Sequence, residues 1–458
     1  MSYIKYIFVI LTLLLSVSCE KEKTEPNVVE DEQIKFFVDD LLDYYYFWNY
    51  DIQDASKQLD LYSDYFDAKL SSLDRWSYMM DRKSWVENET GIFLSYGFSI
   101  TQAFEYYEDY SLRVRYVFPN SPMSDKGVKR GWVLTHLAGV PVMDLLIQDK
   151  FDEEFNKASN TFRFEDTEGK SHEFEATARQ IQTASYLHKD IYTSEDFSGL
   201  TKKVGYFNYV TFNPNMLDDI KGAFSEFNEQ GIEDLILDLR YNPGGDLRAT
   251  ELLANYIAPA SAEGKVFTYR KMNDNLKLQE DESIIRIKRE EDALDLDRIF
   301  IITGSGSASA SELIINGMRP LFGDVNTIAV GDTTYGKPNG MFAIPYPMGP
   351  AEDMYRDAQY VFLPICFYSV NARGEGDYEN GLLPTEYIPE DIKNDWGVDE
   401  LLIKSCLNYI VKGDFPDYRT KTKHTLSNTG GVILLTPESD PNYGLDIQPF
   451  VLFHHKLF

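Results

Sequence analysis

The stretch DRIFIITGSGSASASELIING, Asp297–Gly317, joins a strand pattern, a small-residue turn and a helix pattern in one run. Arg298–Ile302 is rich in β-branched residues, as expected of a buried strand. Serine then takes every second position from Ser305 to Ser311, and an apolar helical pattern begins near Glu312. This order predicts a nucleophile displayed on a strand-to-helix turn. A Gly/Ser linker is the alternative, but apolar segments flank the run without a polar spacer.

Strands and helices alternate around this run, from about Ser185 to Gly413, which predicts an α/β domain. The expected strands are Val204–Phe212, the start of DLILDLRYNPGGDL (Asp234–Leu247), Arg298–Ile302 and Thr327–Val330. The expected helices are Met216–Gln230, Ala249–Ile257 and Glu312–Leu321.

Residues 34–90 follow a helical pattern with one apolar face, which predicts a small helical domain. The residues on that face are Phe37, Leu41, Tyr44 and Trp48. The aromatic run Tyr44–Tyr50 is interpreted as core packing, because aromatic residues at helical spacing usually bury themselves. Carbohydrate binding is the alternative.

Residues 91–183 alternate strand-like runs with turn residues. The order Ser121-Pro122, Gly127, Gly131 and Gly139 resembles that of a PDZ domain. The resemblance implies that backbone N–H groups of Tyr96, Gly97 and Phe98 hold a peptide C-terminus while the peptide adds as a strand. A glycine-rich small β domain is the alternative.

The chain of 458 residues has 44 Lys and Arg against 74 Asp and Glu, a formal net charge of −30. This balance argues against nucleic-acid binding, because every phosphate contact would work against the protein's own field. The content of hydrophobic residues, 43%, is that of a folded chain with a large core.

The N-terminus has the pattern of a processing signal. Lys5, the apolar run Ile7–Leu15 and the small residues before Cys19 resemble a bacterial lipoprotein signal, in which Cys19 is lipidated. An ordinary secretory signal with an incidental cysteine is the alternative. Residues 20–33 would form a tether, similar in its acidic start to surface lipoproteins of the Bacteroidetes type. The expected location is the cell envelope, with a lipid anchor in the outer membrane, on its periplasmic or surface face.

Two cysteines remain in the mature chain, Cys366 and Cys406, which is too few for a disulfide framework or a zinc site. The sequence leaves open whether they pair or stay as two buried thiols.

Histidine is missing between His188 and His424, so a serine nucleophile in the α/β domain has no local histidine base. His188, or a histidine of another domain, could still reach the site, but a neutral lysine is the first base to consider, and burial must lower its pKa from about 10.4. Lys337 suits this role because it lies in a glycine-bordered turn between apolar strands. The glycine turn Asn242–Gly245 follows a buried strand, and its backbone N–H groups could stabilise an oxyanion.

These segments, in this order, resemble the S41 family of serine peptidases, the C-terminal processing or tail-specific proteases. The family motif Ser-Ala-Ser-Ala-Ser-Glu matches Ser307–Glu312, which implies that Ser309 is the nucleophile. Thr334–Lys337 matches Thr-Tyr/Phe-Gly-Lys and implies that Lys337 is the base. Tyr378–Asp391 is similar to the Gly-x-x-Pro segment that follows the site. The resemblance covers about Gly91–Gly413.

The resemblance implies an α/β catalytic domain of the ClpP/crotonase-like type over residues 184–413, followed by an extension over 414–458. An all-β PDZ-like domain and the N-terminal helical domain would precede it. The implied reaction is cleavage near the C-terminus of proteins with apolar or disordered tails, through an acyl-enzyme. The N–H of Ala310 and that of Gly244 or Gly245 would hold the oxyanion. No cofactor and no metal are expected.

One position departs from the family pattern: many members have glutamine four residues after the lysine, where this chain has Met341. The third catalytic member therefore stays open. Ser305, Ser307 and Ser311 are expected to be structural, with hydroxyls able to cap the helix, and Glu312 to favour the helix dipole. Two other functions compete: a non-catalytic PDZ-like lipoprotein that captures peptide tails, and a crotonase-like acyl-CoA enzyme.

Overall fold

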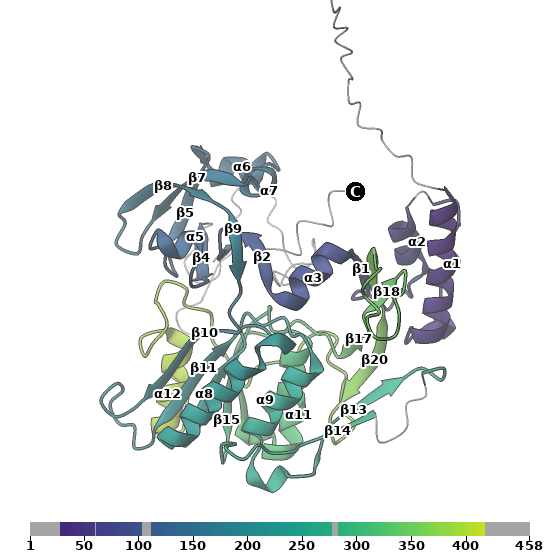
Figure 1. The fold of residues 1–458 in the computed structure, drawn as a ribbon. Coiled ribbons are helices and arrows are strands. Elements are labelled where there is room, and N and C mark those ends of the chain that lie inside the picture. The colour runs from purple at the N-terminus through teal and green to yellow at the C-terminus, as the bar shows by residue number, and fades with distance from the viewer. Residues whose placement is uncertain (1–27, 60, 103–110, 277–282, 417–458) are drawn as a thin grey trace, which may run out of the picture.

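The computed structural model describes residues 28–59, 61–102, 111–276 and 283–416 (Figure 1). Cys19, the expected lipidation site, and most of the expected extension over 414–458 lie outside these ranges. Within them, no helix combines the length and the apolar character needed to cross a bilayer.

The central sheet has six strands in the order β10-β11-β12-β15-β16-β21. All neighbours are parallel except β10 and β11, which are antiparallel. The strands are β10 (Tyr186–Tyr192), β11 (Val204–Tyr209), β12 (Asp234–Asp238), β15 (Ile299–Thr303), β16 (Thr327–Gly331) and β21 (Glu386–Tyr387). The helices are α8 (Leu217–Gln230), α9 (Leu247–Ile257), α11 (Ala310–Phe322) and α12 (Leu401–Lys412). The predicted α/β pattern is confirmed.

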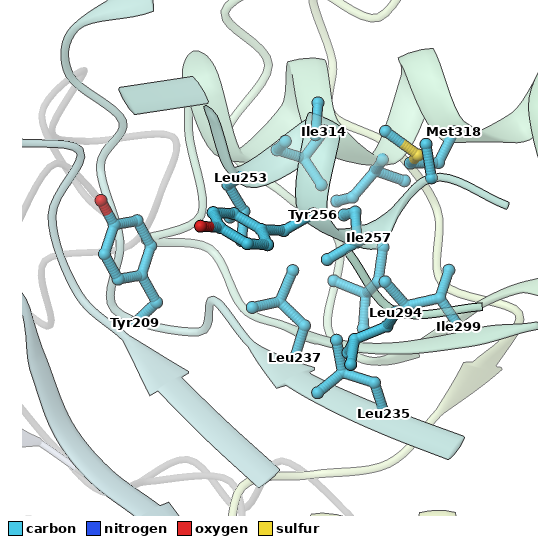
Figure 2. Packing of buried hydrophobic residues seen from close by; sticks show 14 of the residues in the cluster. Tyr209, Leu235, Leu237, Leu253, Tyr256, Ile257, Leu294, Ile299, Ile314 and Met318 are labelled. Carbon is cyan, nitrogen blue, oxygen red and sulfur yellow. The ribbon is translucent and has the colours of Figure 1, made fainter. Parts of the chain in front are cut away.

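Side chains alternate between the two faces of the sheet along each strand, so the hydrophobic core has one part on each face. Leu235 and Leu237 pack against α8, α9 and α11, in the cluster drawn in Figure 2. Ile236, between them, points to the opposite face and packs with α12. The central strands β15 and β16 are buried along their whole length and mainly apolar, as is typical of a parallel sheet with helices on both faces (Figure 1).

Two smaller sheets lie beside the central one. The first has the order β14-β13-β20-β17 and the second β1-β19-β18. Their strands are β13 (Val266–Met272), β14 (Ile284–Arg286), β17 (Asn339–Met341), β20 (Ile365–Val370), β1 (Tyr78–Asp81), β18 (Ile344–Tyr346) and β19 (Tyr360–Leu363). They connect the central sheet to the N-terminal helices (Figure 1).

The N-terminal segment contains α1 (Val28–Tyr45), α2 (Tyr62–Lys69) and α3 (Arg82–Thr90). The predicted helical stretch was too uniform, because β1 interrupts it and pairs antiparallel with β19. The predicted tether was too long, because α1 already begins at Val28.

The expected apolar face of this segment needs a second correction. Tyr44 is 49% exposed, and Trp48 lies beyond the end of α1. Leu41 is buried as expected and Phe37 packs partly buried against the same cluster, and Ile34 and Val38 complete the buried face. The aromatic run Tyr44–Tyr50 supplies core residues after the helix has ended, Tyr46 and Trp48 among them.

Residues 92–182 form a separate unit around the sheet β3-β4-β5-β7-β8, with β6 paired to β5. Its strands are β2 (Ile92–Ser95), β3 (Phe98–Gln102), β4 (Leu112–Val117), β5 (Val133–Leu137), β6 (Val140–Pro141), β7 (Ser159–Glu165), β8 (Ser171–Thr177) and β9 (Arg179–Gln182). Its described residues also form the short helices α5 (Pro122–Asp125), α6 (Val142–Ile147) and α7 (Phe151–Phe155). Ser121 and Ser124 form a reciprocal capping box at the start of α5.

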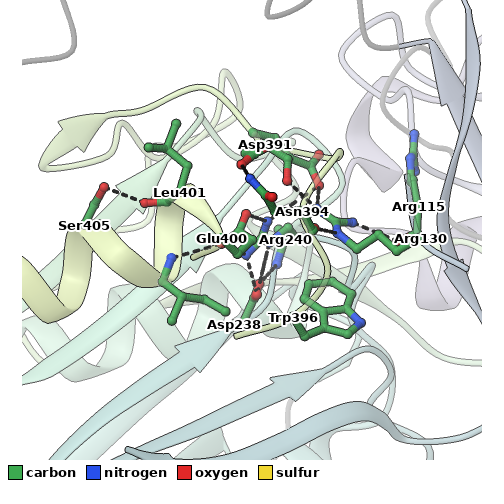
Figure 3. Close-up of polar contacts among 12 residues, drawn as sticks. Arg115, Arg130, Asp238, Arg240, Asp391, Asn394, Trp396, Glu400, Leu401 and Ser405 are labelled. Carbon is green, nitrogen blue, oxygen red and sulfur yellow. Dashed lines mark hydrogen bonds and ion pairs between the residues drawn. The ribbon is translucent and has the colours of Figure 1, made fainter. Parts of the chain in front are cut away.

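A buried charge network joins this unit to the central sheet (Figure 3). Arg130 donates to the Tyr241 hydroxyl at 2.6 Å and to Glu390 Oε1 at 3.0 Å. Arg240 pairs with Asp238 at 2.8 Å and with Glu400 at 2.7 Å. Burial alone would raise the pKa of Glu390, but Arg130 and Arg240 outweigh it and lower that pKa to about 2.

Candidate active site

The three segments singled out in the sequence follow the carboxyl ends of three adjacent parallel strands. The glycine turn, Asn242–Gly245, follows β12. The turn that carries Ser309, here called the serine turn, follows β15, and the loop that carries Lys337, here called the lysine loop, follows β16. In open α/β sheets this edge is where ligands bind. The fold therefore brings Gly244, Ser309 and Lys337 to one cavity, which they line together.

Ser309 stands at the start of α11 in a strained conformation. Its φ of 53° and ψ of −109° lie in a region that L-residues other than glycine seldom adopt. The neighbouring serines anchor the turn, since Ser307 Oγ donates to Leu239 O at 2.7 Å and Ser311 Oγ to Asn242 O at 2.8 Å. The expectation that these hydroxyls cap the helix is therefore wrong, because both reach across to the turn after β12.

The glycine turn lies directly against the serine turn. A Cβ on Gly244 would lie 2.8 Å from Ser309 Cβ and 2.9 Å from Ala310 N, so only glycine fits there. The N–H of Gly244 already donates to Asn242 Oδ1 at 2.9 Å. Among the described residues no acceptor is found for the N–H of Gly245 or of Ala310, the first residue of α11. Of the two glycines proposed as oxyanion donors, Gly245 thus has the available N–H.

Glu312 is fully buried beneath the turn, and its carboxylate accepts four hydrogen bonds. Oε1 accepts from Thr334 Oγ1 at 2.6 Å and from Gly336 N at 2.7 Å. Oε2 accepts from Ser309 N at 2.9 Å and from Lys337 N at 2.7 Å. Burial raises the pKa of Glu312, and the four hydrogen bonds oppose that rise. Glu312 does lie in the first turn of α11, but its main role is to join the serine turn to the lysine loop.

Lys337 is half-buried, and burial lowers the pKa of its ammonium to about 8. The carboxylates of Asp74 and Glu312 oppose this shift but are outweighed. Nζ lies 3.7 Å from Met341 Sδ, a weak acceptor. Within the described part of the chain, no hydrogen bond joins Ser309 Oγ to Lys337 Nζ. The two side chains share the cavity, and Glu312 fixes the backbones that carry them.

The cavity has a volume of about 1340 Å³, and one of its walls was not foreseen. Residues of the N-terminal segment between Asp67 and Glu89 line it, together with the three catalytic-domain segments. None of the described residues of the 92–182 unit lines it. Sequence reasoning missed this wall and the function of Glu312, because no local pattern signals contacts between such distant parts of the chain.

The predicted peptide-binding loop lies away from this cavity. Tyr96 and Phe98 bury their side chains, and the Tyr96 hydroxyl donates to Lys157 O at 2.5 Å. Gly97 has a φ of 81°, and its N–H donates to Ser95 Oγ at 2.9 Å. The two cysteines are also accounted for: Cys366 and Cys406 are free, buried thiols in different hydrophobic clusters.

Comparison with known proteins identifies the central part of the chain. Residues 203–355 match the model of peptidase family S41. The carboxy-terminal processing protease CtpB of Bacillus subtilis is 30% identical over 145 residues, which cover 31% of this chain and 27% of that protein. A candidate CtpA-like serine protease of Staphylococcus haemolyticus is 24% identical over 264 residues, covering 56% of this chain and 47% of that protein.

A solved structure extends the likeness to most of the fold. A candidate S41 protease from Bacteroides fragilis superposes with a TM-score of 0.66 and 21% identity, over 82% of this chain and 96% of that one. At that identity the likeness concerns the fold. The aligned regions span between about a quarter and about half of the two sequence relatives' own lengths. The chain thus contains a region, residues 203–355, that matches peptidase family S41.

Proposed function

We propose that this chain is a serine endopeptidase that cleaves proteins near their C-terminus, with Ser309 as nucleophile and Lys337 as general base. The observation that carries the proposal is the double attachment of Glu312 Oε2, to Ser309 N at 2.9 Å and to Lys337 N at 2.7 Å. It holds a strained serine and a lysine of lowered pKa at the same cavity. The match of residues 203–355 to peptidase family S41 supports the same reaction class.

In the proposed mechanism, neutral Lys337 removes the proton of Ser309 as Oγ attacks the peptide carbonyl. The N–H groups of Ala310 and Gly245 stabilise the oxyanion that forms. Lys337 then gives its proton to the leaving amine, and the C–N bond breaks to leave an acyl-enzyme on Ser309. Water hydrolyses that ester in the second half of the reaction. Because Met341 offers only a thioether, packing and Glu312 have to hold the lysine in place.

We further propose that the 92–182 unit binds substrate tails in the manner of a PDZ domain, and that Cys19 anchors the protein by a lipid in the cell envelope. Support for the first comes from the five-stranded sheet path and from the loop at Gly97, whose φ of 81° turns the chain sharply. Support for the second comes from the sequence pattern before Cys19. Apolar or disordered C-terminal tails are the expected substrates.

The test incubates residues 20–458 with casein, an unfolded protein, beside Ser309→Ala and Lys337→Ala. Each variant is also treated with an alkyl fluorophosphonate, which forms a bond from Ser309 Oγ to phosphorus and releases fluoride. We expect cleavage and labelling by the parent, and neither by Ser309→Ala. Cleavage that persists in both variants would refute the assignment. A parent that neither cleaves nor reacts would favour the non-catalytic peptide-binding protein.

A further inference from the structure

We propose that Arg75, on the loop between α2 and β1, is a positioning residue for Lys337, so that the N-terminal segment is a working part of the active site. This inference rests on the proposed function. It concerns how the base is held, and it assigns no chemical step to the arginine.

Arg75 donates hydrogen bonds to three backbone carbonyl groups at the lysine loop. Its Nη2 lies 2.6 Å from Glu379 O, 3.0 Å from Gly336 O and 3.4 Å from Tyr335 O. Its guanidinium also lies over the rings of Trp76, at 4.9 Å, and Tyr335, at 5.0 Å. Two of the three carbonyls belong to the residues immediately before Lys337.

These carbonyls converge because the segment around Gly336 and the segment around Gly381 lie very close together. A Cβ on Gly336, where φ is +93°, would lie 2.2 Å from Glu379 O. A Cβ on Gly381 would likewise lie 2.1 Å from Thr334 O. Carbonyl dipoles that point to one place repel one another, and a planar cation with several donors relieves that repulsion.

The loop that carries Arg75 is itself fixed. Asp74 Oδ1 accepts from Trp76 N at 2.8 Å and from Ser77 N at 3.0 Å. Ser77 Oγ in turn accepts from Ile365 N at 2.8 Å. The Trp76 ring is 7% exposed and stacks on Trp48 at 6.4 Å. The guanidinium therefore projects from a rigid base, although Arg75 itself lies exposed on the cavity rim.

Opposite charges thus hold the lysine loop from opposite sides. Glu312 binds the N–H groups of Gly336 and Lys337, and Arg75 binds the carbonyls of Tyr335 and Gly336. Both charged side chains form hydrogen bonds with peptide groups beside Lys337. Neither of them forms a hydrogen bond with the Lys337 side chain. This arrangement sets the direction in which the Lys337 side chain leaves the backbone.

The protonation of Lys337 depends on this placement. The charged groups that act on it are Asp74 from the N-terminal loop and Glu312 from α11, and both oppose the lowering by burial. If Arg75 is lost, the lysine loop relaxes toward solvent and Lys337 becomes less buried. Because burial is what lowers the pKa of Lys337, that pKa then rises toward its ordinary 10.5.

The experiment measures fluorophosphonate labelling of Ser309 against pH in the parent, Arg75→Met, Arg75→Lys and Arg289→Met. Arg289 is the matched control, because it also donates to backbone carbonyls, Ala258 O at 3.1 Å and Leu294 O at 2.7 Å, but does not line the cavity. We expect Arg75→Met to label about 10- to 100-fold more slowly, with its pH midpoint moved upward. Arg75→Lys should lie between it and the parent, and Arg289→Met should keep the parental midpoint.

A parental rate and midpoint in Arg75→Met would overturn the inference. A slower labelling rate at an unchanged pH midpoint would also overturn the inference. That result would mean that Arg75 shapes the cavity but does not position Lys337. If Arg75→Met does not fold, the midpoint of Arg75→Lys decides the question in the same way. A parent that is not labelled at all refutes the proposed function, and the inference falls with it.

Discussion

The carboxylate of Glu312 accepts a hydrogen bond of 2.7 Å from the backbone N–H of Lys337. A residue of α11, the helix that begins directly after Ser309, thereby holds the chain segment that carries Lys337, the proposed base. The two catalytic candidates come from different strand ends, so without this contact the serine turn and the lysine loop could move independently.

Glu312→Gln should destabilise the protein and slow the reaction of Ser309. Glutamine keeps the shape but replaces one acceptor oxygen by an NH₂ group, which would face N–H donors in this site. We expect the free energy of unfolding to fall by about 3 kcal/mol. The labelling rate should fall about 100-fold because serine and lysine lose their relative placement. Urea unfolding and fluorophosphonate labelling measure the two effects.

The control is Glu375→Gln, because the Glu375 side chain is 54% exposed in its contact with Arg373. A surface pair of this kind contributes about 0–1 kcal/mol. Equal effects of the two substitutions would contradict the role given to Glu312.

The rate of Ser309 labelling should rise with pH and be half-maximal near the pKa of Lys337, about 8. Below that pH the ammonium is protonated and cannot accept the proton of the serine. Lys337→Arg keeps the charge but stays protonated, so above pH 8 we expect a rate about 100- to 10 000-fold lower than that of the parent. Labelling rates of the parent and of Lys337→Arg, measured over a series of pH values, give both profiles. A parental rate that does not change on either side of pH 8 would exclude Lys337 as the base.

Gly244→Ala should abolish labelling and lower stability. The added Cβ would lie 2.8 Å from Ser309 Cβ and 2.9 Å from Ala308 O, at a φ of +104°. Gly374→Ala is the matched control, since Gly374 has a φ of +82° with open space around it. The control should lose only about 1 kcal/mol of strain energy and keep its labelling rate. A labelled, stable Gly244→Ala would mean that the two turns are not in contact.

Acid should weaken the junction between the 92–182 unit and the central sheet. The pKa of Glu390 is lowered from 4.5 to about 2, so its ion pairs stabilise the fold above pH 4.5. That stabilisation is lost as the pH falls from 4.5 toward 2. Urea midpoints followed by tryptophan fluorescence should therefore fall over this range, and less steeply in Glu390→Gln. Parallel curves for the two proteins would show that Glu390 contributes nothing there.

The sequence pattern was sufficient for the elements that carry the site. The apolar run Ile299–Thr303, the small residues after it and the helix from Ala310 could be predicted because each is a local pattern. The position of Lys337 in a glycine-bordered loop could be predicted from the sequence in the same way. The start of α11 was placed two residues late, near Glu312, because a serine at the N-cap and a serine inside the first turn look alike in sequence.

The contacts that complete the site could not be predicted. Arg75 reaches Tyr335 and Gly336 across more than half of the chain, and no periodicity records such a pairing. The burial of Glu312 depends on donors from the lysine loop, so in isolation it looked like an ordinary first-turn carboxylate. The strand β1 was missed because pairing with β19 decides its conformation.

The residues that line the cavity begin at Asp67 and end at Tyr378 in the sequence, so a fragment that contains all of them must include that whole range. During synthesis the serine emerges before the lysine, and the wall is complete only when the chain has passed Tyr378. A prematurely terminated product that stops between Ser309 and Lys337 would have a nucleophile without its base. On the proposed function, such a truncated chain would lack cleaving activity.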